Sequence, residues 1–423
     1  MIGKGSSVII DLPTASATSP SLVRRINAGL VLRTLRTRSS MSRSEISAAT
    51  GLSQPTVNDI AAMLLRDRLA IETATPDQAP SGRRGPKAAR LAFNAAAGHV
   101  LGIDIGAAQI VVLVADLTGR IVGRTRLEAG PRCSLRPDPL LARLDEAVST
   151  TLAQARLARR DLVSIGVGVP AIVDPVSGRA SLVPALPDWE GLALVPRLQP
   201  GFDCPILVNT DVHLACLAES RLGAAREDAN AVYIHLGVGI GMGVLIGGRL
   251  LPGFDGAAGQ IGNLPIPGDD DPPEAGFGQF EWTAGSSAFA RLGRRATPSS
   301  LIAQFAGGDP EAIGPATIAA AAAAGDAEAR RIMARQIEHL AQGLAAVTCV
   351  LNPATIILGG EIAAIGAALV GPLRTRLAAL VPRPPRHVIA SFLGTESVAL
   401  GAVQVALQEA EGRLLAPTPA KVA

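Results

Sequence analysis

The chain has 423 residues, of which 48% are hydrophobic, 18% charged and only 3% aromatic. This length exceeds what one hydrophobic core fills, so we expect two or three domains whose cores consist of aliphatic side chains. No uncharged apolar run reaches the roughly 18 residues of a membrane span, and the N-terminus lacks the pattern of a signal peptide. These features argue against an integral membrane protein, and we expect no membrane partner and a cytoplasmic location.

Charge is distributed unevenly along the chain. Residues 1–95 contain 13 Lys and Arg against 6 Asp and Glu, which gives a net charge of +7. The remaining residues contain 26 basic against 30 acidic side chains, which gives −4. A basic N-terminal region on a mildly acidic body predicts that this region binds a polyanion.

Residues 1–20 are predicted to be a disordered tail, and a helix-turn-helix follows them. The sequence from Ser42 to Glu45 is a capping box, which opens a short helix that ends at Gly51. Ser53 caps the next helix, so a three-residue turn joins the two helices. In this motif the second helix enters the major groove of DNA.

Polar residues around the start of that second helix are candidates for contacts with DNA. Asn and Gln side chains can hydrogen-bond adenine, whereas Thr can hold a phosphate or touch a thymine methyl group. The candidate DNA-binding residues in these helices are Arg43, Ser53, Gln54, Thr56 and Asn58. A plain helical hairpin with solvent-exposed polar residues is the alternative.

A predicted hairpin after the helices favours DNA binding over that alternative. Residues 69–72 and 90–93 have the pattern of short strands, and the segment between them contains Arg83, Arg84 and Lys87. A hairpin of this kind is a wing, which carries basic side chains to phosphates or into the minor groove. A charged, solvated turn is the alternative for this segment alone. With the helix-turn-helix directly before it, the segment predicts a winged DNA-binding domain.

Strands and helices alternate through the rest of the chain. The predicted strands are 99–106, 109–115, 121–127, 162–169, 205–208 and 356–358, with further strand patterns on both sides of a glycine-rich stretch. The predicted helices are 137–159, 212–222, 284–295, 316–324, 326–351 and 397–411. This alternation predicts a doubly wound α/β body with two lobes around a cleft.

The stretch from Gly237 to Asn263 contains ten glycines. Glycine at this density beside strand patterns indicates backbone that approaches a ligand closely, or turns with positive φ. A flexible linker would contain more serine and would lack the flanking β-branched residues. We therefore expect this stretch to line a ligand site.

Five motifs in this order resemble the ROK family (repressors, open reading frames, kinases). They are the winged helix, GIDIG from Gly102, VNTD ending at Asp211, GQIGN from Gly259, and LGG from Leu358. The resemblance implies an α/β protein in which an N-terminal winged helix-turn-helix precedes a two-lobed, actin-like sugar-kinase fold. Regulators of this family respond to sugars and are usually homodimers or homotetramers. The boundaries that we expect are a tail over 1–20, the winged helix-turn-helix over 21–93, a linker over 94–99, a first lobe over 100–208 with about 395–415, and a second lobe over 209–394.

The phosphate-holding turn of the family's kinases is altered in this chain. Where the kinases have Gly-Gly-Thr-Lys, residues 106–109 read Gly-Ala-Ala-Gln, so the hydroxyl and the lysine charge are lost. ATP phosphates need donors and cations, so we expect neither kinase activity nor a cofactor. Asp211 matches the family's catalytic base and is expected to be vestigial, although it can accept a hydrogen bond from a sugar hydroxyl. A carboxylate that merely stabilises a helix N-terminus is its alternative.

The family's sugar and zinc residues are also changed. Gln260 and Asn263 stand where the family has a sugar-contacting Glu and a zinc-ligating His. Asn is a poor zinc ligand, and the four cysteines are scattered without metal-binding spacing, so no metal is expected. Matched position by position, the resemblance gives as candidate ligand-binding residues Trp189, Thr210, Asp211, Gln260, Asn263 and Glu281. Trp189 could equally pack in a core, and Glu281 could be an exposed acid at a helix start.

Together these features favour a DNA-binding transcription regulator, expected to repress carbohydrate-related genes, whose body senses a sugar or sugar derivative. The expected partners are a double-stranded DNA operator and the small-molecule effector. Two alternatives stay open. The body could be an ATP-dependent sugar kinase with Asp211 as base, or it could have lost sugar sensing and serve only for oligomerisation.

Overall fold

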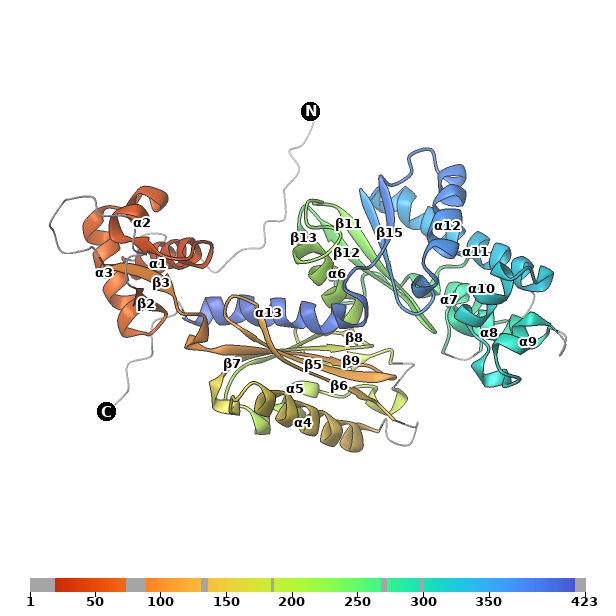
Figure 1. Cartoon of the computed structure of the whole chain (residues 1–423), viewed down its shortest axis with the longest axis horizontal. Coiled ribbons are helices and arrows are strands. Elements are labelled where there is room, and N and C mark those ends of the chain that lie inside the picture. Colours follow the sequence, from red (N-terminus) through yellow and green to blue (C-terminus); the bar gives the residue numbers. More distant parts are fainter. Residues whose placement is uncertain are drawn as a thin grey trace, which may run out of the picture. The chain divides into compact units, whose positions relative to one another are not determined.

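The computed structural model describes residues 20–73, 89–130, 136–183, 186–267, 272–274, 276–296 and 300–414. The chain divides into two compact units, each with a hydrophobic core of its own (Figure 1). The first unit contains Met1–Gly98, Asp116–Thr118 and Gln408–Ala423, and the second contains His99–Ala115 and Gly119–Leu407. No helix in the described ranges is long and apolar enough to cross a membrane.

The first unit has the predicted helix-turn-helix. Its helices are α1 (Pro20–Arg36), α2 (Arg43–Thr50) and α3 (Gln54–Arg66). The capping box is confirmed, because Ser42 N donates to Glu45 Oε2 at 2.7 Å and Glu45 N donates to Ser42 Oγ at 3.2 Å. Gly51 ends α2 with a φ of 71°, and Ser53 accepts a hydrogen bond from Thr56 N at the start of α3.

The strands of the predicted wing are also confirmed. β2 (Ala70–Thr73) pairs antiparallel with β3 (Arg90–Phe93). A short strand that we did not predict, β1 (Met41–Ser42), pairs with the other edge of β3. The basic residues predicted at the tip, Arg83, Arg84 and Lys87, lie outside the described residues.

The second unit contains two five-stranded sheets with the same strand order. The first consists of β4 (His99–Ile105), β5 (Gln109–Asp116), β6 (Ile121–Glu128), β7 (Leu162–Val169) and β10 (Ile206–Thr210). The second consists of β11 (Ala231–Leu236), β12 (Ile240–Ile246), β13 (Arg249–Leu250), β14 (Thr355–Gly359) and β15 (His387–Ala390). In each sheet the first strand along the chain lies at the centre, with the second and third on one side and the fourth and fifth on the other. A short hairpin, β8 (Ile172–Val173) and β9 (Ala180–Ser181), follows β7.

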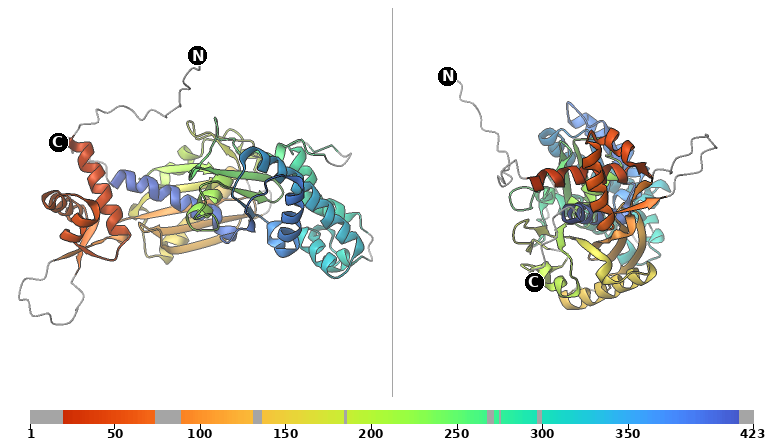
Figure 2. Two further views of the ribbon diagram at one scale, coloured as in Figure 1. Left: turned by 90° about the horizontal axis from the view of Figure 1, so that it is seen from above. Right: turned by 90° about the vertical axis from the view of Figure 1, so that its left-hand side faces the viewer.

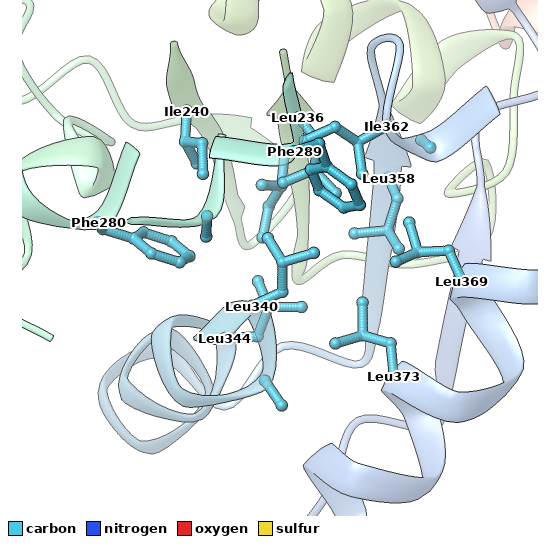
Figure 3. Close-up of a cluster of buried hydrophobic side chains, with 14 of the residues drawn as sticks. Leu236, Ile240, Phe280, Phe289, Leu340, Leu344, Leu358, Ile362, Leu369 and Leu373 are labelled. Carbon is cyan, nitrogen blue, oxygen red and sulfur yellow. The ribbon is translucent and has the colours of Figure 1, made fainter. Parts of the chain in front are cut away.

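Helices connect and cover these sheets. They are α4 (Pro137–Gln154), α5 (Leu194–Leu198), α6 (Asp211–Arg221), α7 (Gln279–Ala284), α8 (Ser286–Arg294), α9 (Leu301–Phe305), α10 (Pro315–Ala323), α11 (Ala327–Leu351), α12 (Ala367–Leu380) and α13 (Ser397–Leu414). Figure 3 shows how α7, α8, α11 and α12 bury leucine, isoleucine and phenylalanine against β11, β12 and β14. This aliphatic core fixes the second sheet and, through α7, one end of the glycine-rich stretch.

Close packing places α6 between the second sheet and α13 (Figures 1 and 2). A Cβ on Gly243 of β12 would lie 2.3 Å from Val212 O in α6, and a Cβ on Gly401 of α13 would lie 1.9 Å from Leu214 O. Only glycine permits such an approach between backbones. The N-terminus of α6, where Asp211 lies, is therefore held on two sides.

Two predicted helix ranges were wrong, and two elements were missed. The helix predicted over 137–159 ends at Gln154, because Arg156 takes a φ of 57° and a short 3₁₀ helix follows. The helix predicted over 284–295 is two helices, since Gly285 is extended and separates α7 from α8. Neither α12 nor β15 was predicted.

Candidate functional site

Two acidic residues lie at the carboxyl ends of strands in the first sheet. Asp104 is the last residue but one of β4, and Asp211 follows β10 directly as the first residue of α6. β4 and β10 flank β7 on its two sides, and all three strands run parallel. Ligands of α/β proteins bind outside the carboxyl ends of such strands. This edge of the sheet is therefore the candidate site.

Asp104 is buried without a partner. The residue is 8% exposed and forms no hydrogen bond or ion pair with any residue that the structure describes. Burial raises the pKa of its carboxyl well above the ordinary value, and the neighbouring Asp211 raises it further. Sequence analysis did not select Asp104, although it occupies the centre of the GIDIG motif. Its oxygens keep contact with solvent at the edge of the sheet, so this unpaired carboxyl is accessible to a ligand.

Asp211 is half-buried and has a backbone donor. Its Oδ1 atom accepts a hydrogen bond from Val212 N at 2.7 Å, in the first turn of α6. Burial raises the pKa of Asp211, while His235, the Val212 amide and His213 act in the opposite direction. The helix N-terminus thus stabilises this carboxylate, and its other lone pairs can accept a hydrogen bond from a ligand.

Two histidines that sequence analysis did not select lie near Asp211. His213 is buried on α6, and its Nε2 atom lies 3.0 Å from the carbonyl oxygen of Ala258 in the glycine-rich stretch. Because that oxygen can only accept, Nε2 carries a proton, and burial lowers the pKa of His213. His235 is half-buried on β11, and it lowers the pKa of Asp211 more than His213 does. The position of His213 two residues after Asp211 is the feature of the sequence that could have identified it.

Glu281 connects the start of the glycine-rich stretch to the start of α7 and lies against Gly262 near the end of that stretch. Its Oε1 atom accepts a hydrogen bond from Gly278 N at 2.9 Å, and its Oε2 atom accepts one from Ile240 N at 3.1 Å. A Cβ on Gly262 would lie only 2.4 Å from Oε2. Glu281 is therefore a brace within the fold. The contact of Glu281 with a ligand stays a prediction. The two hydrogen bonds show that this residue also has a structural role.

The sequence of the second unit matches a known family, since residues 100–409 match the ROK family. The chain belongs to the ROK family. It is 25% identical to the xylose repressor of Caldicellulosiruptor bescii over 356 residues, which cover 84% of this chain and 88% of that protein. It is 28% identical to the glucokinase of Thermotoga maritima over 306 residues, which cover 71% of this chain and 91% of that protein.

Solved structures of ROK proteins have the same fold. The crystal structure of a ROK family transcriptional regulator, a homologue of the Escherichia coli Mlc protein, matches with a TM-score of 0.71. The two chains are 24% identical, and the match covers 93% of this chain and 98% of that one. The predicted architecture of a helix-turn-helix followed by a ROK fold is confirmed.

The turn that holds phosphate in ROK kinases is folded here without its cation. Gly106 N donates to Gln109 O at 2.9 Å, which closes the turn. An open cavity of about 670 Å³ lies beside it, lined by Ala108, Gln109, Arg126, Glu128 and Gly130. Arg126 donates to Thr395 Oγ1 at 3.3 Å, and Glu128 in the same wall carries the opposite charge. The cavity wall therefore offers no net positive charge to a phosphate group.

The two residues that replace the ROK sugar and zinc contacts have free amides. Gln260 is half-buried and precedes a short 3₁₀ helix over Ile261–Asn263, and Asn263 is exposed. Neither side chain hydrogen-bonds another residue in the described ranges. Both amides can therefore donate to and accept from ligand hydroxyls.

Two other predicted ligand contacts are engaged in the fold. Trp189 is 1% exposed and packs in the core of the first sheet, which favours the packing alternative, and its contact with a sugar ring stays a prediction. Thr210 is buried, and its Oγ1 atom accepts a hydrogen bond from Val173 N at 3.3 Å. Its hydroxyl connects β10 to β8 beside Asp211.

In the first unit, α3 presents the predicted DNA contacts at its N-terminal end. Gln54 and Asn58 are exposed and lie one helical turn apart, hence on the same face. Ser53 and Thr56 hydrogen-bond each other at 2.8 Å and cap the helix. Arg43 lies 3.4 Å from Glu72 in an ion pair, so this arginine is partly neutralised. The polar face of α3 is therefore available for DNA.

Proposed function

We propose that this protein is a DNA-binding transcription regulator, a repressor whose ROK unit binds a sugar or related polyol and thereby changes the affinity of the helix-turn-helix for its operator. One observation carries this proposal: the same chain joins a helix-turn-helix with an exposed polar face to a ROK unit whose phosphate turn has lost its Thr and Lys. The similarity to a xylose repressor supports it, because that match covers 84% of this chain.

The ligand would bind at the carboxyl edge of the first sheet, against Asp211 and the amides of Gln260 and Asn263. A ligand that binds one arrangement of the ROK unit better than another shifts the equilibrium toward it, and DNA affinity follows. Helix-turn-helix proteins read two half-sites as dimers, so the proposal includes a homodimer or a larger even-numbered assembly.

DNA binding by the purified full-length chain tests the proposal. We expect the chain to shift DNA from upstream of its own gene, with an affinity that falls linearly with the logarithm of the salt concentration. Replacing Gln54 and Asn58 together with Ala should weaken binding at least tenfold. Gln408→Ala, which changes an exposed glutamine outside the helix-turn-helix, is the matched control. Absence of salt-sensitive DNA binding would contradict the proposal.

A sugar kinase is the second candidate, because Asp211 is retained and a glucokinase is 28% identical to this chain. The missing cation in the phosphate turn opposes it. Sugar-dependent hydrolysis or transfer from ATP would establish this activity, provided that Asp211→Asn abolishes it. We expect no such turnover above that of Asp211→Asn.

A further inference from the structure

Asp59 lies on α3 and has no part in the function proposed above. The buried side of this helix consists of Val57, Ile60, Ala61 and Leu64. At about 100° per residue, Asp59 lies about 150° from the mean direction of these four side chains, whereas Asn58 lies about 110° and Gln54 about 70° from it. Of the polar residues near the start of α3, Asp59 therefore points most directly away from the core. This is the side that a helix-turn-helix turns toward the major groove.

The carboxylate of Asp59 has no partner in the described structure. The residue is exposed and forms no hydrogen bond or ion pair with any described residue. On a helix, an ion pair joins residues three or four positions apart. These positions around Asp59 hold Pro55, Thr56, Ala62 and Met63. None of them is basic, and the exposed Pro55 and Ala62 have no polar side-chain atoms. The carboxylate is therefore free to accept from an external donor.

A free carboxylate at this place opposes the general attraction between this unit and DNA. Residues 1–95 carry a net charge of +7, which attracts a polyanion. An acid on the side of α3 that enters the groove instead repels the phosphates. Asp59 thus lowers the affinity for DNA in general, and it can raise affinity only for sequences that offer it a hydrogen-bond donor.

The four bases differ in what they offer to a carboxylate in the major groove. Cytosine presents its N4 amino group as a donor. Guanine presents two acceptors, and thymine presents an acceptor and a methyl group, so neither can donate to a carboxylate. Adenine presents a donor beside the N7 acceptor, which an amide side chain matches and a carboxylate does not. Cytosine is therefore the base that fits Asp59.

Resting on the proposed function, we propose that Asp59 is a specificity-determining residue, whose carboxylate accepts a hydrogen bond from the N4 amino group of a cytosine in each half of the operator. Asn58 precedes it on the helix and, as an amide, suits an adenine. The half-site thus contains a C·G pair at the position that Asp59 reads. An amide in place of this carboxylate changes the preferred base at that position from cytosine to adenine.

Selection from a library of random DNA duplexes with the purified full-length protein tests this inference without a known operator. We expect the enriched sequences to share one C·G pair in each half-site. In the best-bound duplex, replacing that pair by A·T should lower the affinity of the wild-type protein at least tenfold, a difference of about 1.4 kcal/mol. The same replacement should change the affinity of Asp59→Ala less than twofold. Equal losses for the two proteins, or enriched sequences without such a pair, overturn the inference.

Asp59→Asn separates base reading from simple repulsion of phosphates. This variant removes the same charge as Asp59→Ala but keeps an amide, so selection with it should enrich A·T where the wild type enriches C·G. If both variants bind every duplex more tightly by the same factor, Asp59 only repels phosphates and the inference fails. Because Asp59 is exposed, both should keep the melting temperature of the wild type, so that lost selectivity does not reflect lost folding.

Asp67→Asn is the matched control. Asp67 is an exposed acid at the end of the same helix, and its carboxylate accepts a hydrogen bond from Arg66 Nε at 3.0 Å. This variant should select the same sequences as the wild type. A shift from C·G to A·T in Asp67→Asn as well would trace the preference to the charge of the unit rather than to Asp59, which contradicts the inference.

The same selection distinguishes failure of this inference from failure of the proposed function. If no sequence is enriched and no duplex binds with salt-dependent affinity, the chain does not bind DNA and both fail. If sequences are enriched but their C·G pairs do not depend on Asp59, the proposed function stands and only the inference fails.

Discussion

Asp104 and Glu281 are two carboxylates of the same unit with opposite surroundings. Glu281 receives two backbone donors, from Gly278 and Ile240, and joins segments that lie far apart in the sequence. Asp104 is more deeply buried and receives none within the described structure. A carboxylate with its donors in place stabilises a fold, whereas one left without donors costs stability. The first is thus a structural element, and the second is placed for a ligand.

The role of Glu281 can be compared with what the resemblance to ROK proteins implies for the same region. In the family that the sequence resembles, zinc holds the region around Asn263, where this chain lacks the ligands. Here the carboxylate of Glu281 accepts a hydrogen bond from Ile240 N, and Gly262 packs beside it. The same carboxylate caps α7 by accepting from Gly278 N. Hydrogen bonds from one acid therefore connect the segments at this place. The predictions below test whether the two acids differ as their surroundings indicate.

Glu281→Ala is expected to have the largest effect on stability. The substitution removes two charge-assisted hydrogen bonds and leaves Ile240 N without its acceptor, so unfolding should become easier by about 3 kcal/mol. Denaturant titration of the purified protein measures this change. Glu281→Gln keeps an acceptor and should lose less than half as much, and Glu128→Ala, at an exposed site, should change stability by less than about 0.5 kcal/mol. If Glu281→Ala lowers the free energy of unfolding by less than about 0.5 kcal/mol, these hydrogen bonds are dispensable for stability.

Gly262→Ala is expected to disturb the same brace from the other side. The added Cβ would lie 2.4 Å from Glu281 Oε2 and 2.8 Å from Ile240 O, so the side chain or the backbone must move. Overpacking of this kind costs about 2 kcal/mol. Combined with Glu281→Ala, which removes the clashing carboxylate, the same change should cost less than it does alone. Strict additivity of the two losses would argue against a direct contact.

Asp104→Asn is expected to stabilise the protein by about 1 kcal/mol at neutral pH, because it removes a buried group that ionises at a cost. Since the pKa of Asp104 in the folded protein lies well above its ordinary value of 3.8, the folded state binds the proton more tightly. The wild-type protein therefore loses stability as pH rises above about 4, up to the raised pKa. The advantage of Asp104→Asn should be near zero at acidic pH and grow across that window. A constant or reversed difference in denaturation midpoints would contradict the assignment.

Local features of the sequence predicted much of the fold. β7 was placed over Leu162–Val169 because Pro170 ends an apolar run, and the capping box at Ser42 marked α2 by its own residues. β15 was missed because the strand has only four residues and is partly exposed. It forms by pairing with β14, and a sequence pattern does not reveal such pairing.

The roles of the two acids could not be predicted for a similar reason. Glu281 receives a donor from Ile240, 41 residues away, so the sequence around it gives no sign of the bond. Asp104 is a candidate for ligand binding because no described residue donates a hydrogen bond to it. Only the folded chain shows this lack of donors. Trp189 is an aromatic side chain of the kind that stacks on sugar rings, and only the folded chain shows that it is buried in the core of the first sheet. The sequence motifs located the site, and the distribution of hydrogen-bond donors assigned its residues.

Asp211 lies between these extremes, and Asp211→Asn should have the smallest effect on stability. Loss of its charge at the N-terminus of α6 costs up to about 1 kcal/mol, while relief of its burial offsets that loss, so the net change should stay within about 0.5 kcal/mol. The amide oxygen can still accept from Val212 N, which preserves the start of the helix. Ligand affinity should nevertheless fall, because a hydroxyl or amine loses a charged acceptor. Denaturation and titration of the same variant separate the two effects. A large loss of stability with unchanged affinity would make Asp211 a helix-stabilising acid, comparable to Glu281 rather than to Asp104.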